Sequence, residues 1–307
     1  MHELAIITIN YNASEFTKKC VASVLENTPK DLDYIMVIVD NASEKSEFDD
    51  LGTFIQKLDS SRLRLERSFI NLGFGGGNMF GAQLVKSKYL LFLNNDTLVN
   101  KNTIKNCLTF LKNTGDAAVC GPQIRNESGK KEISFDHFTS FAREAFGKSF
   151  VESLWRKPVR RKTYDHPITV DYINGSFMCF KAKDFNAVGG FDTTIFLYYE
   201  ESDICLRLKK LGKKTYFLPN TEYVHHQGVT LKKTTASMTK KIELKTSMLY
   251  VIRKHNGYLQ YLLLRVFLTI RYGLKTLVSP RTYPLFKSIL IGLPLGHSLK
   301  QQQKINW

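Results

Sequence analysis

The segment Leu90-Leu91-Phe92-Leu93-Asn94-Asn95-Asp96-Thr97 joins an apolar run to a polar turn. Together with Tyr89, its first residues have the length and composition of a buried strand. Asp96 follows where such a strand would end, and a carboxylate in that place is suited to holding a hard divalent cation through oxygen. The simpler alternative is that the Asn and Asp residues serve only as turn or helix-cap residues.

Similar apolar runs flank this segment and alternate with amphipathic stretches. The pattern predicts strands at residues 4–9, 34–39 and 117–120, and a weaker one around Leu63 and Leu65. It predicts helices from Ser14, an expected N-cap, and at residues 79–86 and 103–111. This alternation is typical of an α/β protein with a Rossmann-like, mostly parallel central sheet covered by helices on both faces.

Polar residues follow four of the predicted strands. These are Asn10-Tyr11-Asn12, Asp40-Asn41, Asn71-Leu72-Gly73 and Asn94-Asn95-Asp96. Ligands of mostly parallel sheets bind at the carboxyl ends of the strands. One polar turn would mean little, but four of them predict a shared polar rim.

The second half of the chain departs from this rhythm. Residues 137–166 carry a basic cluster at 156–162 and are expected to form a loop or short helices. Apolar patterning resumes at 168–180, a helix is predicted at 202–211 with Gly212 as its C-cap, and a strand at 216–219. After residue 236 the chain turns helical and basic. We therefore predict a catalytic domain over residues 1–235 and a helical, basic C-terminal appendage over residues 236–307.

Composition narrows the class of protein. The chain has 307 residues, 43% of them hydrophobic, and its 44 Lys and Arg against 28 Asp and Glu give a net charge of +16. This charge favours anionic partners. The five cysteines form no Cys-x-x-Cys pair, so we expect buried free thiols in a reducing compartment and no zinc site. No signal peptide and no uncharged stretch of membrane-spanning length is present, which predicts a cytoplasmic protein.

Three further segments could carry chemistry. The glycine-rich stretch from Asn71 to Gly81 enters a predicted helix, where backbone amides could meet phosphate or sugar oxygens. Its spacing is not that of a dinucleotide fingerprint. Another stretch, Tyr198-Tyr199-Glu200-Glu201-Ser202-Asp203, holds three carboxylates, which either favour the helix dipole or supply a general base. Finally, His225 follows a strand-like run and is either a metal ligand or an ordinary polar residue.

In order and spacing, these segments together resemble family 2 glycosyltransferases of the GT-A fold, near bacterial rhamnosyltransferase-like and galactofuranosyltransferase-like members. The resemblance runs from about Leu4 to Gly228. It is carried by residues 37–43, the Asn71–Gly81 turn, Asn94-Asn95-Asp96, Asn174-Gly175-Ser176, Gly189-Gly190-Phe191-Asp192, Glu200-Glu201-Ser202-Asp203 and His225.

The resemblance implies roles for individual residues. Asp96 and His225 would hold Mn²⁺ or Mg²⁺, and Glu201 would be the catalytic base, with Glu200 and Asp203 beside it. Tyr11 and Asp40 would contact the nucleotide base. The remaining donor-side positions are Asn71, Gly73, Asn94, Asn95, Gly175 and Ser176. Two departures are visible: Asn94-Asn95-Asp96 replaces an Asp-rich motif, and Glu replaces the more common Asp at the base position.

This resemblance implies transfer of a sugar by a single displacement with inversion. The donor would be a dTDP- or UDP-sugar, such as a rhamnose donor. The acceptor would be a hydroxyl of a glycan or lipid-linked acceptor in cell-surface polysaccharide synthesis. One rival is a nucleotide-sugar or glycan-binding protein of the same fold without catalysis, which the Asn-for-Asp change supports. A second rival is nucleic-acid binding, but no recognised nucleic-acid motif accompanies the basic charge, so we expect no such partner.

The C-terminal region offers one more expectation. Residues 258–278 mix large apolar residues with Arg265, Arg271 and Lys275, and a further apolar stretch follows at 288–295. Such a composition suits a helix lying on an anionic membrane surface. The alternative, given nearly equal weight, is packing on the catalytic domain or a homo-oligomer contact. The enzyme would then be cytoplasmic or peripheral on the inner face of the cytoplasmic membrane.

Overall fold

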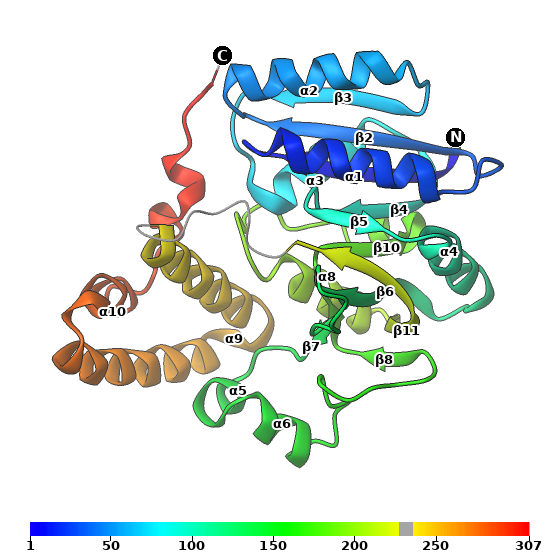
Figure 1. Ribbon diagram of the computed structural model, residues 1–307. Helices are drawn as coiled ribbons and strands as arrows, with labels where there is room; N and C mark the ends of the chain where they lie inside the picture. Colours follow the sequence, from blue (N-terminus) through cyan, green and yellow to red (C-terminus); the bar gives the residue numbers. More distant parts are fainter. Residues whose placement is uncertain (227–235, 307) are drawn as a thin grey trace.

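The computed structural model describes residues 1–226 and 236–306 (Figure 1). A nine-stranded sheet forms its centre, in the order β3-β2-β1-β4-β10-β6-β11-β5, with β8 beside β11. Its strands are β1 (His2–Asn10), β2 (Tyr34–Asn41), β3 (Leu63–Ser68), β4 (Ser87–Leu93), β5 (Thr97–Val99), β6 (Ala117–Arg125), β8 (Ile168–Val170), β10 (Phe177–Lys181) and β11 (Lys214–His225).

The first four strands are parallel, as the alternation of strands and helices predicts. Strand β10 is antiparallel to both β4 and β6, whereas β6 and β11 are parallel to each other. The sheet is therefore mixed but mostly parallel. The carboxyl ends of β1, β2 and β4 meet at one edge of the sheet, which is where the polar turns of the sequence are found.

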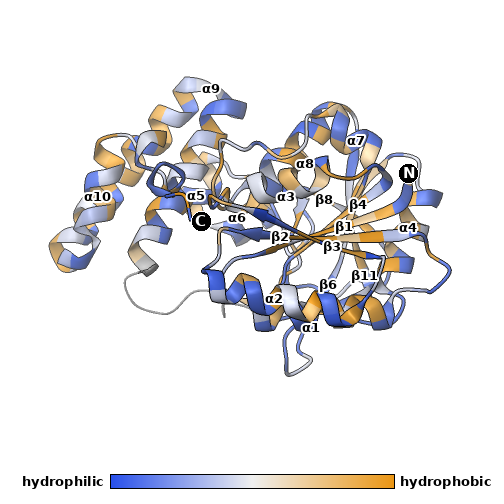
Figure 2. Cartoon of the chain, turned by 90° about the horizontal axis from the view of Figure 1, so that it is seen from above, coloured by the Kyte–Doolittle hydropathy of each residue, from blue (hydrophilic) through white to orange (hydrophobic). Residues whose placement is uncertain are grey.

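Helices cover both faces of the sheet (Figure 2). One face carries α1 (Ser14–Asn27), α2 (Lys45–Leu58) and α4 (Thr103–Asn113), and the other α3 (Gly73–Gln83), α7 (Ala182–Ala187) and α8 (Glu200–Lys210). Successive side chains of a strand point to opposite faces. Accordingly, Leu4 and Ile6 of β1 pack in the first core, and Ala5 and Ile7 in the second. All five cysteines are buried and free, as expected.

Several element boundaries differ from the expectation. Helix α3 begins at Gly73, not near residue 79, so the glycine-rich segment is itself helical. Ser14 is the first residue of α1 and makes no capping hydrogen bond, because its hydroxyl donates to Asp50 instead. The predicted strand at 216–219 and the run before His225 are one strand, β11, which continues past a register shift between Leu218 and Glu222.

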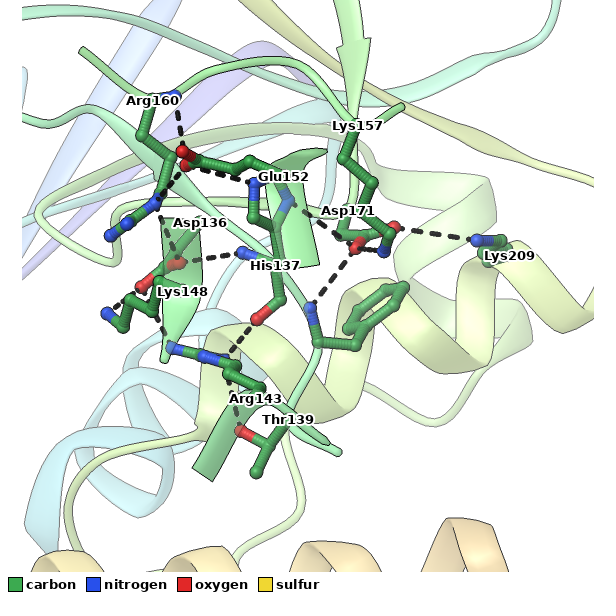
Figure 3. A network of polar contacts seen from close by, with 11 residues as sticks. Asp136, His137, Thr139, Arg143, Lys148, Glu152, Lys157, Arg160, Asp171 and Lys209 are labelled. Atoms are coloured by element: carbon green, nitrogen blue, oxygen red, sulfur yellow. Dashed lines mark hydrogen bonds and ion pairs between the residues drawn. The ribbon is translucent and has the colours of Figure 1, made fainter. Parts of the chain in front are cut away.

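The excursion predicted at residues 137–166 lies within residues 135–173 of the structure. They contain β7 (Phe135–Asp136), α5 (Phe141–Phe146), α6 (Lys148–Leu154) and β9 (Tyr172–Ile173), as well as β8. A polar network holds this excursion together (Figure 3). Within it, Arg143 donates to Asp136 at 2.9 Å and Arg160 to Glu152 at 2.6 Å. Part of the basic cluster at 156–162 is therefore used inside the fold.

The C-terminal region is helical, as predicted. Helix α9 (Ala236–Val278) is broken at Gly257, whose φ is 85°, and α10 (Tyr283–Leu290) packs back against it. Short 3₁₀ turns lie at Pro280–Thr282, Leu295–His297 and Leu299–Gln302. The boundary at residues 235 and 236 and the end of the resemblance at Gly228 touch residues outside the described part, so the two-domain division stays a prediction.

Helices α9 and α10 have an apolar core of their own, built around Leu264, Leu268, Leu285 and Ile289. The region also docks on the rest of the molecule. Phe267 packs against Phe141 of α5 with ring centroids 5.5 Å apart. Within the described residues, no helix is both long and apolar enough to cross a bilayer.

Candidate active site

A cavity of about 530 Å³ opens at the carboxyl ends of β1, β2 and β4. Seven residues that the sequence singles out line it: Tyr11, Asn71, Gly73, Asn94, Asn95, Asp96 and His225. They come from four separate segments of the chain. The shared polar rim predicted from the turns thus exists, and it surrounds a cavity large enough for a small ligand.

Asp96 and His225 form a pair inside this cavity. The turn after β4 lies against the end of β11, because β5 pairs with β11 and opposes Thr97 to His225. His226 N donates to the Asp96 carbonyl at 2.9 Å, and His225 Nε2 lies 3.1 Å from Asp96 Oδ1. In the described part of the chain, His225 Nδ1 is buried without a hydrogen-bond partner. An imidazole and a carboxylate are therefore held together at the cavity.

A buried polar chain supports the same turn from behind. Asn95 Nδ2 donates to Thr17 Oγ1 at 2.9 Å, and Thr17 Oγ1 donates to Asn10 Oδ1 at 2.8 Å. Asn10 Nδ2 in turn donates to Asp40 Oδ1 at 3.0 Å. Asp40 has no exposed surface, and its other carboxylate oxygen accepts from Ser43 N. The structure thus puts Asp40 behind the cavity wall and not among the lining residues.

The neighbouring residue, Asn41, lines the cavity instead. Its side chain donates to Asn71 Oδ1 at 2.9 Å and accepts from Leu72 N at 2.9 Å, so it fixes the turn before α3. Gly73 follows with φ of 74°, and a Cβ added there would lie 2.1 Å from the Phe196 carbonyl oxygen. Only glycine fits this close approach.

The acidic segment forms the first turn of α8, which lies on the same face of the sheet as α3 and α7. Tyr198 and Tyr199 precede the helix with φ values of 72° and 73°, in the left-handed region that residues other than glycine seldom adopt. A Cβ added at Gly175 would lie 3.9 Å from Glu201 Oε2 and 3.5 Å from Phe74 Cζ. Phe74 lines the cavity, whereas Gly175 and Glu201 do not, so the Glu201 carboxylate lies beyond the lining residues.

The environment of α8 shifts the pKa of its first two carboxyl groups. Burial raises the pKa of Glu201 to about 7, and among nearby charges Asp136 raises it further while Arg143 opposes the shift. Both of these charged residues belong to the polar network of the excursion (Figure 3). Glu200 is 1% exposed, and burial, followed by the charge of Glu201, raises its pKa well above the ordinary range.

Asp203 has different surroundings. It is fully buried and pairs with Arg207 at 2.6 Å, with Lys254 at 2.7 Å and with His255 at 2.7 Å. Burial opposes its ionisation, but the hydrogen bond from His255 and the two cations outweigh burial and lower its pKa. Two of these partners belong to α9, so Asp203 ties α8 to the C-terminal region.

Ser176 also lies behind the cavity wall. It is 1% exposed, its hydroxyl lies 2.6 Å from the Tyr223 hydroxyl, and its carbonyl accepts from Asn94 N at 2.9 Å. The structure thus brings Ser176 next to a lining residue without making it one. The sequence analysis gives no individual site role to several residues that line the cavity: Asn41, Phe74, Asn78, Lys240, Leu299 and Gln303. For Asn41 the polar turn itself was the available signal.

Comparison with known proteins identifies the class. Among solved structures, a crystal structure of GalNAc-T7 with UDP, GalNAc and Mn²⁺ superposes with a TM-score of 0.61 at 15% identity, covering 80% of this chain and 47% of that one. Mannosyltransferase PcManGT from Pyrobaculum calidifontis, in complex with GDP-Man and Mn²⁺, gives a TM-score of 0.57 at 13% identity, covering 96% of this chain and 87% of that one. The fold is the GT-A fold of glycosyltransferases.

The sequence profile of glycosyl transferase family 2 matches residues 5–184, and the chain belongs to this family. It is thus a glycosyltransferase. It is similar to Rhamnosyltransferase WbbL of Escherichia coli (strain K12), with 25% identity over 81% of this chain and 92% of that protein. It is also similar to the N-acetylglucosaminyl-diphospho-decaprenol L-rhamnosyltransferase of Mycobacterium tuberculosis, with 23% identity over 83% of this chain and 86% of that protein.

Proposed function

We propose that this protein transfers a sugar, with inversion, from a nucleoside-diphosphate sugar to an acceptor hydroxyl, and that Glu201 is the general base. The single observation that carries the proposal is the place of Glu201, whose carboxylate lies beside Gly175, next to which Phe74 lines the cavity that holds Asp96 and His225. A pKa of about 7 suits a group that must accept a proton near neutral pH.

In this mechanism Glu201 takes the proton of the acceptor hydroxyl while the hydroxyl oxygen attacks the anomeric carbon. The bond from that carbon to the diphosphate breaks, and the nucleoside diphosphate leaves with the electron pair. Holding donor and acceptor in line in one cavity supplies much of the rate advantage. The buried surroundings of Glu201 keep its carboxylate poorly solvated, which makes it a stronger base than an exposed glutamate.

The residues at the cavity fit a divalent metal. Across residues 1–226 and 236–306, no three His, Cys, Asp or Glu side chains gather into a group that could hold a metal ion. Asp96 and His225 do form a pair, and His225 keeps one buried ring nitrogen without a partner. We propose that these two residues hold Mn²⁺ or Mg²⁺ together with oxygens of the donor. When bound, the metal offsets charge on the leaving diphosphate.

The names of the relatives guide the choice of substrate. Two of them are rhamnosyltransferases, and one of these is named for transfer onto a diphospho-decaprenol-linked N-acetylglucosamine. We therefore propose a dTDP- or UDP-linked 6-deoxyhexose such as rhamnose as the donor. A glycan or a lipid-linked sugar in polysaccharide synthesis would be the acceptor.

Donor hydrolysis, measured over dTDP-rhamnose, UDP-galactofuranose, UDP-glucose and GDP-mannose, tests the proposal. We expect hydrolysis of one donor class, dependent on added Mn²⁺ or Mg²⁺ and slowed by Glu201→Gln. Tight binding of a donor without hydrolysis or transfer to any acceptor would instead favour a binding protein that has lost catalysis. Binding of nucleic acid that falls steeply with salt, without donor turnover, would contradict the enzyme altogether.

We also propose that the C-terminal region rests on an anionic bilayer. The outer side of α9 beyond Gly257 exposes an apolar stripe at helical spacing: Leu259, Leu263, Val266, Ile270, Leu274 and Leu277. This stripe lies opposite the inward residues Leu264 and Leu268. The inward face of this helix packs in the C-terminal core, and among the described residues the outward apolar face stays exposed. A helix that lies on a membrane surface buries such a face in lipid.

The charge of this region supports lipid over a second copy of the chain. After Glu243 the chain contains ten Lys and Arg residues and not one Asp or Glu. Two such surfaces would repel each other, whereas each basic residue near an anionic leaflet would add about 1 kcal/mol. An acceptor carried on a lipid would be reached from this position.

Co-sedimentation with vesicles of phosphatidylglycerol and phosphatidylcholine tests the docking. The full chain should pellet at low salt, and Ile270→Asp in the stripe should release it. Leu58→Asp, at an exposed apolar residue of α2, is the matched control and should pellet normally. If wild type stays in the supernatant, the docking proposal is wrong. If Ile270→Asp instead halves the molecular mass in lipid-free solution, the stripe is a contact between two copies.

A further inference from the structure

The wall of the active-site cavity is not built by the sheet and its helices alone. Lys240 from the start of α9, and Leu299 and Gln303 near the end of the chain, also line it. Thus a region that the sequence suggests is an appendage supplies part of the site. Among the lining residues that the structure describes, Lys240 is the only Lys or Arg.

Hydrogen bonds hold the C-terminal segment in place at both of its ends. At one end, Ser298 Oγ and Leu299 N donate to the two carboxylate oxygens of Glu243, each at 2.8 Å. At the other end, Asn306 N donates to the Phe69 carbonyl at 2.7 Å, and Asn306 Nδ2 to the Ser43 carbonyl at 2.9 Å. The segment therefore spans from α9 to the turn after β2, across the cavity.

These contacts occupy Glu243, the acidic residue nearest to Lys240 along α9. Glu243, one turn further along α9, is 2% exposed and is occupied by the C-terminal segment. Within residues 1–226 and 236–306, no Asp or Glu forms an ion pair with Lys240. Burial is the only cause that shifts the pKa of Lys240, and it lowers this pKa. This is the shift expected of an ammonium group that is partly desolvated and has no nearby carboxylate to offset the burial.

We propose that Lys240 is a donor-binding residue that pairs with the diphosphate of the nucleoside-diphosphate sugar. This rests on the proposed function, because it assumes that the cavity is the donor site. A diphosphate brings more than one negative charge into a cavity that already holds Asp96. One divalent metal would offset only part of that charge, and an ammonium without a partner in the same cavity would offset more.

Calorimetric titration of the full chain with uridine and thymidine diphosphates, in Mn²⁺, tests this role. Lys240→Gln should weaken the diphosphate Kd about tenfold to a hundredfold, the range for losing one hydrogen bond to a charged group. The same variant should leave the weaker binding of uridine or thymidine itself unchanged. Lys240→Arg should restore most of the affinity, since it keeps the charge.

The neighbouring residue supplies a matched control. Lys241 is exposed and does not line the cavity, so Lys241→Gln removes the same charge without changing the site. Equal diphosphate affinities for Lys240→Gln and Lys241→Gln would overturn the inference. Equal losses for nucleoside and diphosphate would do the same, because they would show a structural effect. If wild type binds neither diphosphate, the proposed function itself fails.

Discussion

Two acidic segments lie at or near the cavity, and their surroundings differ. In the first turn of α8, Glu200 and Glu201 are adjacent, and burial raises the pKa of both. In the turn after β4, Asp96 follows two asparagines and lies 3.1 Å from His225. A carboxyl with a raised pKa is suited to accepting a proton, whereas one beside an imidazole is suited to sharing a cation.

Asp96→Ala tests the metal side of this comparison and should have the largest effect. Without a carboxylate beside His225, transfer should fall by about a thousandfold or more, the scale of losing a metal that stabilises a leaving group. Steady-state kcat with added Mn²⁺ is the measurement. Asp116→Ala, which removes a surface carboxylate paired with Lys214, should leave kcat unchanged. Full wild-type turnover in the presence of a chelator would remove the metal from the mechanism.

Asp203→Asn tests whether the third acid of α8 serves the structure. Its carboxylate is buried beside two cations, Arg207 and Lys254, and the His255 ring, so removing the charge should cost about 3–5 kcal/mol of unfolding free energy at pH 7. The pKa of Asp203 is lowered, so its contribution is present above the unfolded pKa and is lost as pH falls through the folded pKa.

Chemical denaturation measures the loss of unfolding free energy in Asp203→Asn and in Asp49→Asn. Both aspartates belong to i,i+4 ion pairs. Asp49 pairs with Lys45 on the exposed surface of α2, where the loss should stay below about 1 kcal/mol. Equal losses for the two variants would mean that the ion pairs of Asp203 do not tie α8 to α9.

Asp40→Ala tests the chain of buried hydrogen bonds behind the Asn94–Asp96 turn. Asp40 has no exposed surface, and one route from it to the cavity runs through Asn10 and Thr17 to Asn95. We expect donor Kd to weaken by roughly tenfold while kcat changes little, since one buried acceptor is removed. An unchanged Kd in a direct binding titration would contradict this role.

Glu200→Gln should have the smallest effect and separates the two neighbouring acids. Burial raises the pKa of Glu200 well above its ordinary range, which favours the neutral carboxyl, and glutamine has nearly the same shape. Transfer at pH 7 should therefore stay within about threefold of wild type. A loss as large as that of Glu201→Gln would move the base to Glu200.

Local patterns in the sequence predict a good part of this architecture. The runs at residues 4–9, 34–39 and 90–93 are apolar on both sides, which happens when both faces of a strand are covered, and all three are central strands. The polar turns after these strands predict the polar rim of the cavity, and seven of the named site residues line that cavity.

Other features depend on contacts that no local pattern carries. The segment from Gly73 to Gly81 has poor helix propensity, yet it is helical because its glycines allow close packing on β1. A Cβ on Gly81 would lie 2.6 Å from Ile7, and one on Gly77 would lie 2.9 Å from Ile9. Likewise, Leu299 and Gln303 reach the cavity only because the end of the chain crosses back over the sheet edge.

The pH dependence of transfer in wild type and in Glu201→Gln tests the central claim most directly. With the Glu201 pKa at about 7, kcat/KM of wild type should rise tenfold per pH unit below pH 7 and level off above it. Glu201→Gln should fold as wild type does, bind donor normally, lose transfer by about a hundredfold or more and lack this rise. Near-normal turnover in that variant, with the same pH profile as wild type, would contradict the assignment of Glu201 as the base.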